Sequence, residues 1–189
     1  MKGRFAVALL VLPFAVAGAS AQTQIGLNAV GAKIGLIMPE DPIDNTIGFG
    51  AQLQLGHVIP QIALGAFVDF WSKSYGEKYG GAGAEVSFTE IAVGAVGKYY
   101  FPASGNIKPY AGAGLALNFG RSKVEVAGVP GLFPGYRESD TDTDIGIHLV
   151  GGAEMPLSPT IDGFAEVKYA IDGADYFAIM VGAMYKLGK

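Results

Sequence analysis

Residues 47–58, IGFGAQLQLGHV, decide the fold of this chain. From Ile47 to Leu55 every second position is apolar, and glycine or glutamine fills the positions between. Successive side chains of a β-strand point to opposite faces, whereas a helix would scatter both sets around its circumference. The alternation therefore predicts a strand with one apolar face.

The same period of two recurs along the chain and predicts eight strands. They span residues 25–38, 47–58, 62–70, 90–101, 107–121, 144–155, 164–172 and 176–187. A tilted strand of about ten residues crosses a bilayer, and bacterial single-chain barrels have an even number of strands. We therefore expect an all-β fold, an eight-stranded antiparallel up-and-down transmembrane β-barrel whose apolar phase faces lipid.

The composition excludes several other classes of protein. Only 16% of the 189 residues are charged and half are hydrophobic, which is not the composition of a disordered chain. The chain has no cysteine, so it contains neither a disulfide framework nor a thiolate site. A net charge of −4 and a pI near 5.1 argue against a nucleic-acid partner, which requires a basic patch.

Residues 1–21, MKGRFAVALLVLPFAVAGASA, have the three parts of a secretory signal. Lys2 and Arg4 precede an apolar run, and residues 19–21 form an A-x-A cleavage site. We expect cleavage after Ala21, which leaves residues 22–189 as the outer-membrane β-barrel domain.

The connections between the predicted strands alternate in length. Residues 38–46, 72–89 and 127–143 form long loops, whereas 59–61, 102–106 and 156–162 form shorter turns. The connection at 173–175 is short where a long one is expected. Outer-membrane barrels have long external loops and short periplasmic turns, so both chain ends are expected on the periplasmic side.

Charged residues recur on the phase that would face the lumen. They are Glu90, Lys98, Lys108, Glu154, Glu166, Lys168 and Lys186. In residues 62–70 the same phase also carries Phe67 and Asp69. These charges could form a solute filter or a mutually neutralising plug. The plug is favoured because the interior of an eight-stranded barrel is only wide enough for side chains.

The chain has two histidines, and each is a candidate catalytic group. His57 falls on the lipid phase and His148 on the lumen phase, and no serine lies near either in strand spacing. A hydrogen-bonded lumen histidine is therefore expected at position 148, and no catalytic, cofactor or metal site is predicted.

The predicted external loops carry acidic, basic and apolar groups that could contact ions, lipopolysaccharide or a partner. Acidic residues alternate at Glu138, Asp140, Asp142 and Asp144, which predicts a solvated rim, with calcium binding as the alternative. Arg121 and Lys123 fall on the outward phase, where they could meet lipopolysaccharide phosphates. The apolar tip at residues 129–134 could fold over the barrel mouth or bind a partner.

Several phrases resemble the small outer-membrane β-barrel proteins of the OmpA-like transmembrane group. They are residues 35–39 (GLIMP), 96–102 (VGKYYFP), 108–115 (KPYAGAGL), 164–169 (FAEVKY) and 181–187 (VGAMYKL). Such proteins usually end in an aromatic residue, whereas Leu187 takes that register here and two residues follow. The resemblance implies location in the outer membrane of a Gram-negative-type bacterium. It also implies contact with lipid and lipopolysaccharide, and assembly by periplasmic chaperones and the barrel-assembly machinery.

The function expected is non-enzymatic and either structural or a surface interaction, with an external partner that the sequence does not identify. One alternative is a porin-like channel for small solutes. Another is a secreted soluble barrel that binds an apolar ligand inside, and that reading requires an inward apolar phase.

Overall fold

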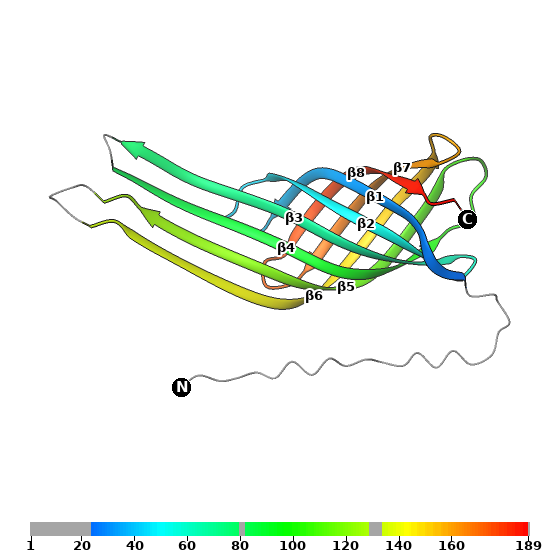
Figure 1. The fold of residues 1–189 in the computed structure, drawn as a ribbon, viewed down its shortest axis with the longest axis horizontal. Coiled ribbons are helices and arrows are strands. Elements are labelled where there is room, and N and C mark those ends of the chain that lie inside the picture. Colours follow the sequence, from blue (N-terminus) through cyan, green and yellow to red (C-terminus); the bar gives the residue numbers. More distant parts are fainter. Residues whose placement is uncertain (1–23, 80–81, 129–133, 189) are drawn as a thin grey trace, which may run out of the picture.

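The computed structural model describes residues 24–79, 82–128 and 134–188, and it shows a ring of eight strands (Figure 1). The strands are β1 (Gln24–Pro39), β2 (Thr46–Ile59), β3 (Ile62–Tyr79), β4 (Ala82–Tyr100), β5 (Lys108–Val126), β6 (Tyr136–Pro156), β7 (Ile161–Ile171) and β8 (Tyr176–Lys186). Each pairs antiparallel with the next, and β8 pairs with β1 to close the barrel. The predicted fold class is confirmed. The expected signal, residues 1–21, lies outside the described residues.

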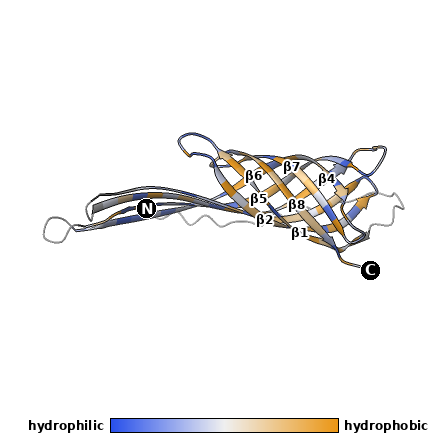
Figure 2. Ribbon diagram, turned by 90° about the horizontal axis from the view of Figure 1, so that it is seen from above, coloured by the Kyte–Doolittle hydropathy of each residue, from blue (hydrophilic) through white to orange (hydrophobic). Residues whose placement is uncertain are grey.

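The outer face of the barrel is apolar, as the alternation predicts (Figure 2). Ile34, Leu53, Val93 and Val181 are each between 39% and 55% exposed, although they lie mid-strand. Aromatic side chains mark both ends of this band: Phe49, Phe119, Tyr169 and Phe177 at one end, and Tyr99, Phe101 and Tyr185 at the other. A soluble barrel would turn this phase inward, so that alternative is wrong. No helix among the described residues is long and apolar enough to cross a membrane.

Glycines on the inner phase make room for aromatic side chains inside the barrel. A Cβ atom added to Gly94 would lie 2.7 Å from Cζ of Phe67, and one added to Gly152 would lie 2.9 Å from Cζ of Tyr110. Both rings are buried. The alternation of glycine with large residues therefore packs a narrow interior.

A β-bulge near the end of β2 changes the facing of the residues that follow it. Gly56 has a φ of 102°, a conformation that favours glycine, and the register with β3 shifts between Gln54 and Gly56. His57 consequently lies opposite Ala63, a buried inner-phase residue, and its ring lies 6.4 Å from that of Tyr100. The prediction that His57 faces lipid is wrong, because it assumes an uninterrupted alternation and the bulge inserts one extra residue.

Two predicted long loops contain long stretches of strand: residues 72–79 and 82–89 of the loop 72–89, and residues 136–143 of the loop 127–143. β3 and β4 remain paired out to Tyr79 and Ala82, and β5 and β6 out to Val126 and Tyr136. Pairing of β2 with β3 ends at Trp71, and pairing of β6 with β7 ends at Ile147. Beyond the rim, therefore, β3 to β6 continue as a four-stranded sheet (Figure 1), which we call the extension. Neither face of the extension is continuously apolar, as the lipid-facing side of the barrel is.

The membrane boundary on β3 is testable with two substitutions on one phase. Val68 is 44% exposed within the apolar band, and Ser74 is exposed on the extension six positions further along. We expect Val68→Arg to destabilise the folded barrel by about 2–4 kcal/mol, the cost of arginine near the bilayer midplane. Ser74→Arg should change stability by less than about 0.5 kcal/mol, because it lies in water. Urea unfolding in lipid vesicles measures both, and equal losses would contradict this boundary.

Candidate functional site

Ion pairs across the lumen form the centre of the site. Lys168 of β7 is bonded to Asp69 of β3, which lies on the opposite side of the ring. Lys33 of β1 lies 3.0 Å from Asp69 Oδ1 and 3.4 Å from Glu166 Oε1. All four side chains are buried, at 1–5% exposure. The pairs therefore tie together strands that do not neighbour one another in the sheet.

Glu166 links this group to β4 and β5. Its Oε2 lies 3.1 Å from Nζ of Lys98 on β4, and the Tyr110 hydroxyl donates a 2.9 Å hydrogen bond to the same oxygen. We call Lys33, Asp69, Lys98, Glu166 and Lys168 the lumen ion cluster. A buried carboxylate with this many partners is compensated for the loss of water.

The lumen ion cluster holds three lysines and two carboxylates, and aromatic faces lie beside the excess positive charge. Nζ of Lys168 lies 4.0 Å from the centroid of the Phe67 ring, and Nζ of Lys98 lies 4.3 Å from that of Tyr110. The negative face of an aromatic ring attracts a cation at these distances. Phe67 and Tyr110 thus stabilise the lysines and also fill the lumen.

The structure places four of the seven predicted lumen charges in the interior: Glu90, Lys98, Glu166 and Lys168. Three of them join the lumen ion cluster, but Glu90 does not. The cluster also contains two residues absent from the predicted set. Lys33 was missed because its strand alternates least regularly, although it shares the inner phase with Ala29 and Ile37. The sequence did place Asp69 on the inner phase of its strand, but without a partner to suggest its role.

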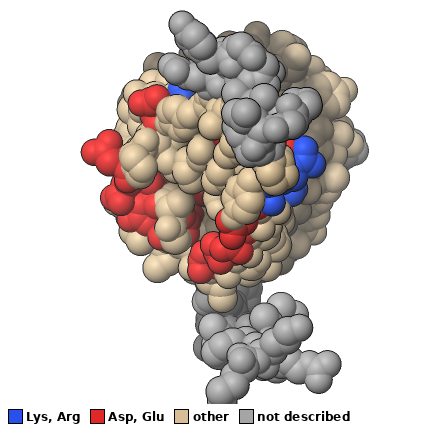
Figure 3. Space-filling model, turned by 90° about the vertical axis from the view of Figure 1, so that its left-hand side faces the viewer, with Lys and Arg blue, Asp and Glu red and all other residues tan. Residues whose placement is uncertain are grey.

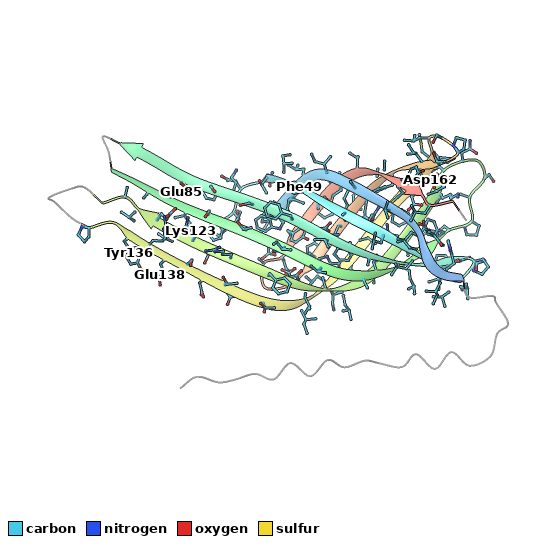
Figure 4. All side chains as sticks on the ribbon, in the orientation of Figure 1. Phe49, Glu85, Lys123, Tyr136, Glu138 and Asp162 are labelled. Atoms are coloured by element: carbon cyan, nitrogen blue, oxygen red, sulfur yellow. The ribbon has the colours of Figure 1, made fainter. Side chains whose placement is uncertain are left out.

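The other three predicted residues lie at the periplasmic end of the barrel, near the short turns. They are Lys108, Glu154 and Lys186. The Tyr100 hydroxyl donates a 2.8 Å hydrogen bond to Glu154, and Lys186 lies 2.7 Å from Asp162, which Figure 4 shows at this end. Lys108 is exposed at the start of β5, opposite Glu154 in register. These residues surround the periplasmic mouth and are not part of the central cluster.

His148 is fully buried in the lumen but is not hydrogen-bonded as expected. Neither ring nitrogen has a hydrogen-bond partner among the described residues, and the closest acid, Asp172, lies 3.9 Å from Nε2. The ring packs 5.2 Å from Phe67 and 6.3 Å from Tyr176, measured between centroids. His148 is therefore held in the lumen by packing against aromatic rings.

The acidic residues of β6 lie on the inner phase of the extension. Figure 3 shows acidic side chains gathered along one side of that end of the molecule. Among residues 24–79, 82–128 and 134–188, no group of three acidic or histidine side chains is close enough to hold a metal ion. The structure thus offers no support for calcium binding. The predicted apolar tip, 129–134, lies outside the described residues except for exposed Pro134.

Basic residues lie on the outward face of the extension, as predicted. Arg121 is exposed opposite Thr89 and Thr141, just above the aromatic band. Lys123 lies 2.6 Å from Glu125 (Figure 4 labels Lys123), and Arg137 pairs with the same carboxylate. The hydrogen bond from Lys123, followed by the charge of Arg137, holds the pKa of Glu125 below its usual value.

A closed ring with an apolar outer face, aromatic ends and paired charges inside defines a transmembrane β-barrel. Residues 6–187 match the family described as "Outer membrane protein beta-barrel domain", and the chain belongs to that family. It is therefore a protein of the outer membrane of a Gram-negative-type bacterium, and its outer face contacts the lipid of that membrane.

Two solved structures show the same fold. The crystal structure of Neisserial surface protein A is 19% identical, covering 84% of this chain and 96% of that one, with a TM-score of 0.58. The crystal structure of Ail, the attachment invasion locus protein of Yersinia pestis, is 15% identical, covering 85% and 99%, with a TM-score of 0.52. None of the curated proteins compared with the chain matches it significantly.

The contribution of the lumen ion cluster is testable at Glu166. We expect Glu166→Ala to lower the free energy of unfolding by about 3–5 kcal/mol, because Lys33 and Lys98 lose a buried partner. Glu138→Ala removes an exposed carboxylate from the extension and should cost less than about 0.5 kcal/mol. Urea unfolding in lipid vesicles compares the two. If they are equally stable, the cluster does not hold the barrel together.

Proposed function

We propose that this chain is a non-enzymatic surface protein whose plugged barrel anchors an extracellular sheet for contact with partners outside the cell. The observation that carries the proposal is the continuation of β3 to β6 past the rim as a paired sheet. An anchor needs only the barrel, so a role limited to the membrane does not account for the extension.

Contacts at its base support a fixed position for the extension. Lys73 donates a 3.1 Å hydrogen bond to the carbonyl of Asn45, and the Thr46 hydroxyl donates a 2.8 Å bond to the carbonyl of Ser72. The Ser72 hydroxyl in turn donates to the carbonyl of Phe88. These bonds tie β3 to the β1–β2 loop and to β4, so the sheet is a continuation of the barrel wall.

The extension offers two surfaces for recognition. On its outward face a hollow of about 1070 Å³ is lined in part by Ser74, Glu85, Glu125 and Arg137. Along β6, residues 136–146 pair with no strand of the described part of the chain on the side away from β5, so their backbone groups form an open edge there. Open edges of this kind pair with added strands in many complexes.

The lumen favours this proposal over the channel alternative. The lumen ion cluster crosses the ring, and the cavity beside Lys98, Tyr100 and Glu154 has a volume of about 20 Å³. That volume holds about one water molecule. A hydrated solute would have to break several buried ion pairs to pass.

The proposal includes the route by which the chain reaches the outer membrane. Periplasmic chaperones and the barrel-assembly machinery insert the chain after its signal, residues 1–21, is removed. Leu187, whose amide donates a 2.8 Å hydrogen bond to the carbonyl of Asn28, takes the register of the usual terminal aromatic residue.

A shortened barrel separates the surface role from a role of the barrel alone. Residues 75–86 and 124–138 are each replaced by Asn-Gly, which joins Ser74 to Ser87 and Lys123 to Ser139, two pairs already opposite in register. We expect this variant to fold, to show heat-modifiable gel migration and to restore detergent resistance to cells that lack the protein. Only the full-length chain should restore attachment of those cells to one another and to surfaces.

Two outcomes would overturn the proposal. Equal attachment with both chains would assign the function to the barrel itself. Steady single-channel conductance of the unmodified protein in a planar bilayer, or swelling of loaded liposomes, would favour the transport alternative.

A further inference from the structure

A polar cavity of about 270 Å³ lies at the extracellular mouth of the barrel. It is lined by residues of β3 to β6, of the β1–β2 loop and of the β7–β8 turn. Four of the lining residues form one row across β3 to β6, each in register with the next, and we call this row the floor. They are Trp71, Glu90, Gly120 and Asp142. A Cβ atom added to Gly120 would meet no atom within 4 Å, so the centre of the floor is open space.

Buried polar groups face this cavity without partners. Glu90 is 4% exposed, and its Oε1 accepts no hydrogen bond from the described residues. Asn118 is also 4% exposed, and both its amide nitrogen and its oxygen lack a partner there. Buried polar atoms are almost always hydrogen-bonded, and both of these residues line the same space. A ligand in this space would therefore supply the partners that these atoms lack.

The cavity is strongly acidic. Its lining includes four carboxylates: Glu90, Asp142, Asp144 and Asp172. One base, Arg121, is among the described lining residues, but it belongs to the outward phase of β5. Inside the barrel the nearby Lys168 is bonded to Asp69. Carboxylates in a cleft with few counter-charges attract cations.

The shape of the cavity selects among cations. No group of three acidic or histidine side chains in the described residues is close enough to hold a bare metal ion. Glu90 and Asp142 lie two strands apart, which places their backbones about 10 Å from each other. Ile43 and Phe88 line the space as well and add apolar surface. Carboxylates separated by open floor and apolar surface match an elongated cation with a hydrocarbon chain.

We propose that this cavity binds a linear diamine or triamine. One ammonium group donates to Glu90 and Asn118, and a second donates to Asp142 at the other side. The alkyl chain crosses Gly120 and packs against Phe88. The site is separate from the outward face and the open edge of the extension, so it does not depend on the surface role proposed above.

Trp71 provides a direct readout, because it lines the cavity and is the one tryptophan in the sequence. The chain is folded into phosphatidylcholine nanodiscs, which carry no net charge, and titrated with spermidine at fixed ionic strength. We expect a saturable change in Trp71 fluorescence and matching heat in calorimetry. Absence of a saturable signal would overturn the proposal.

Two variants alter the cavity, and a matched variant removes a charge outside it. Glu90→Gln removes the buried carboxylate, and Gly120→Val adds a side chain where a Cβ atom would meet no atom within 4 Å. Each should weaken spermidine binding about tenfold or more, as expected for the loss of a charge-assisted hydrogen bond or of the room for the chain. Asp140→Asn removes a charge from the same phase of β6 but outside the lining, and should change affinity by less than about twofold.

The remaining outcomes distinguish specific binding from attraction by charge alone. If Asp140→Asn weakens binding as much as Glu90→Gln, or if Gly120→Val binds normally, the cavity is not the site. If calcium chloride changes Trp71 fluorescence with the same dependence on Glu90, the site takes a metal ion and the amine proposal is wrong. Heat-modifiable migration of each variant verifies that its barrel is folded.

Discussion

Eight strands enclose a lumen only as wide as the side chains that fill it, and most of this molecule follows from that constraint. The outer face must be apolar to meet lipid, so polar residues are confined to the narrow inside. There a lysine or carboxylate has little access to water and needs a partner on another strand. Lys168 and Asp69 meet from opposite sides of the ring for this reason, and Glu166 joins two further strands.

The same constraint divides the lumen into two parts. In the middle, the lumen ion cluster and the rings of Phe67 and Tyr110 fill the space. Towards the extracellular mouth the ring opens because β2 and β7 end while β3 to β6 continue. Glu90 and Asn118 lie at this transition, and Oε1 of Glu90 and the amide group of Asn118 have no hydrogen-bond partner among the described residues. A closed centre and an open mouth fit the surface role that we propose for this barrel.

Much of this could be predicted from the sequence, and what could not has identifiable causes. Residues 47–55 show their facing because lipid on one side and lumen on the other impose opposite chemistry. Residues 72–79 and 82–89 are strand too, but water bathes both faces of the extension, and no alternation marks them. The bulge at Gly56 reverses the facing of His57 by one inserted residue. The pairing of Lys33 with Asp69 depends on closure of the ring, which the order of residues along one strand does not contain.

The extension also sets a height. From Phe70 in the aromatic band to Tyr79 at the end of β3 the chain advances nine residues, which at about 3.3 Å per residue is about 30 Å of strand. Even along a tilted strand, this length carries the end of β3 beyond the lipid headgroups. Adding or removing two residues in each of the two strands of a hairpin would move its tip by about 7 Å along the strands without touching the barrel. The reach of this protein into its surroundings is thus a variable that can change independently of its anchor.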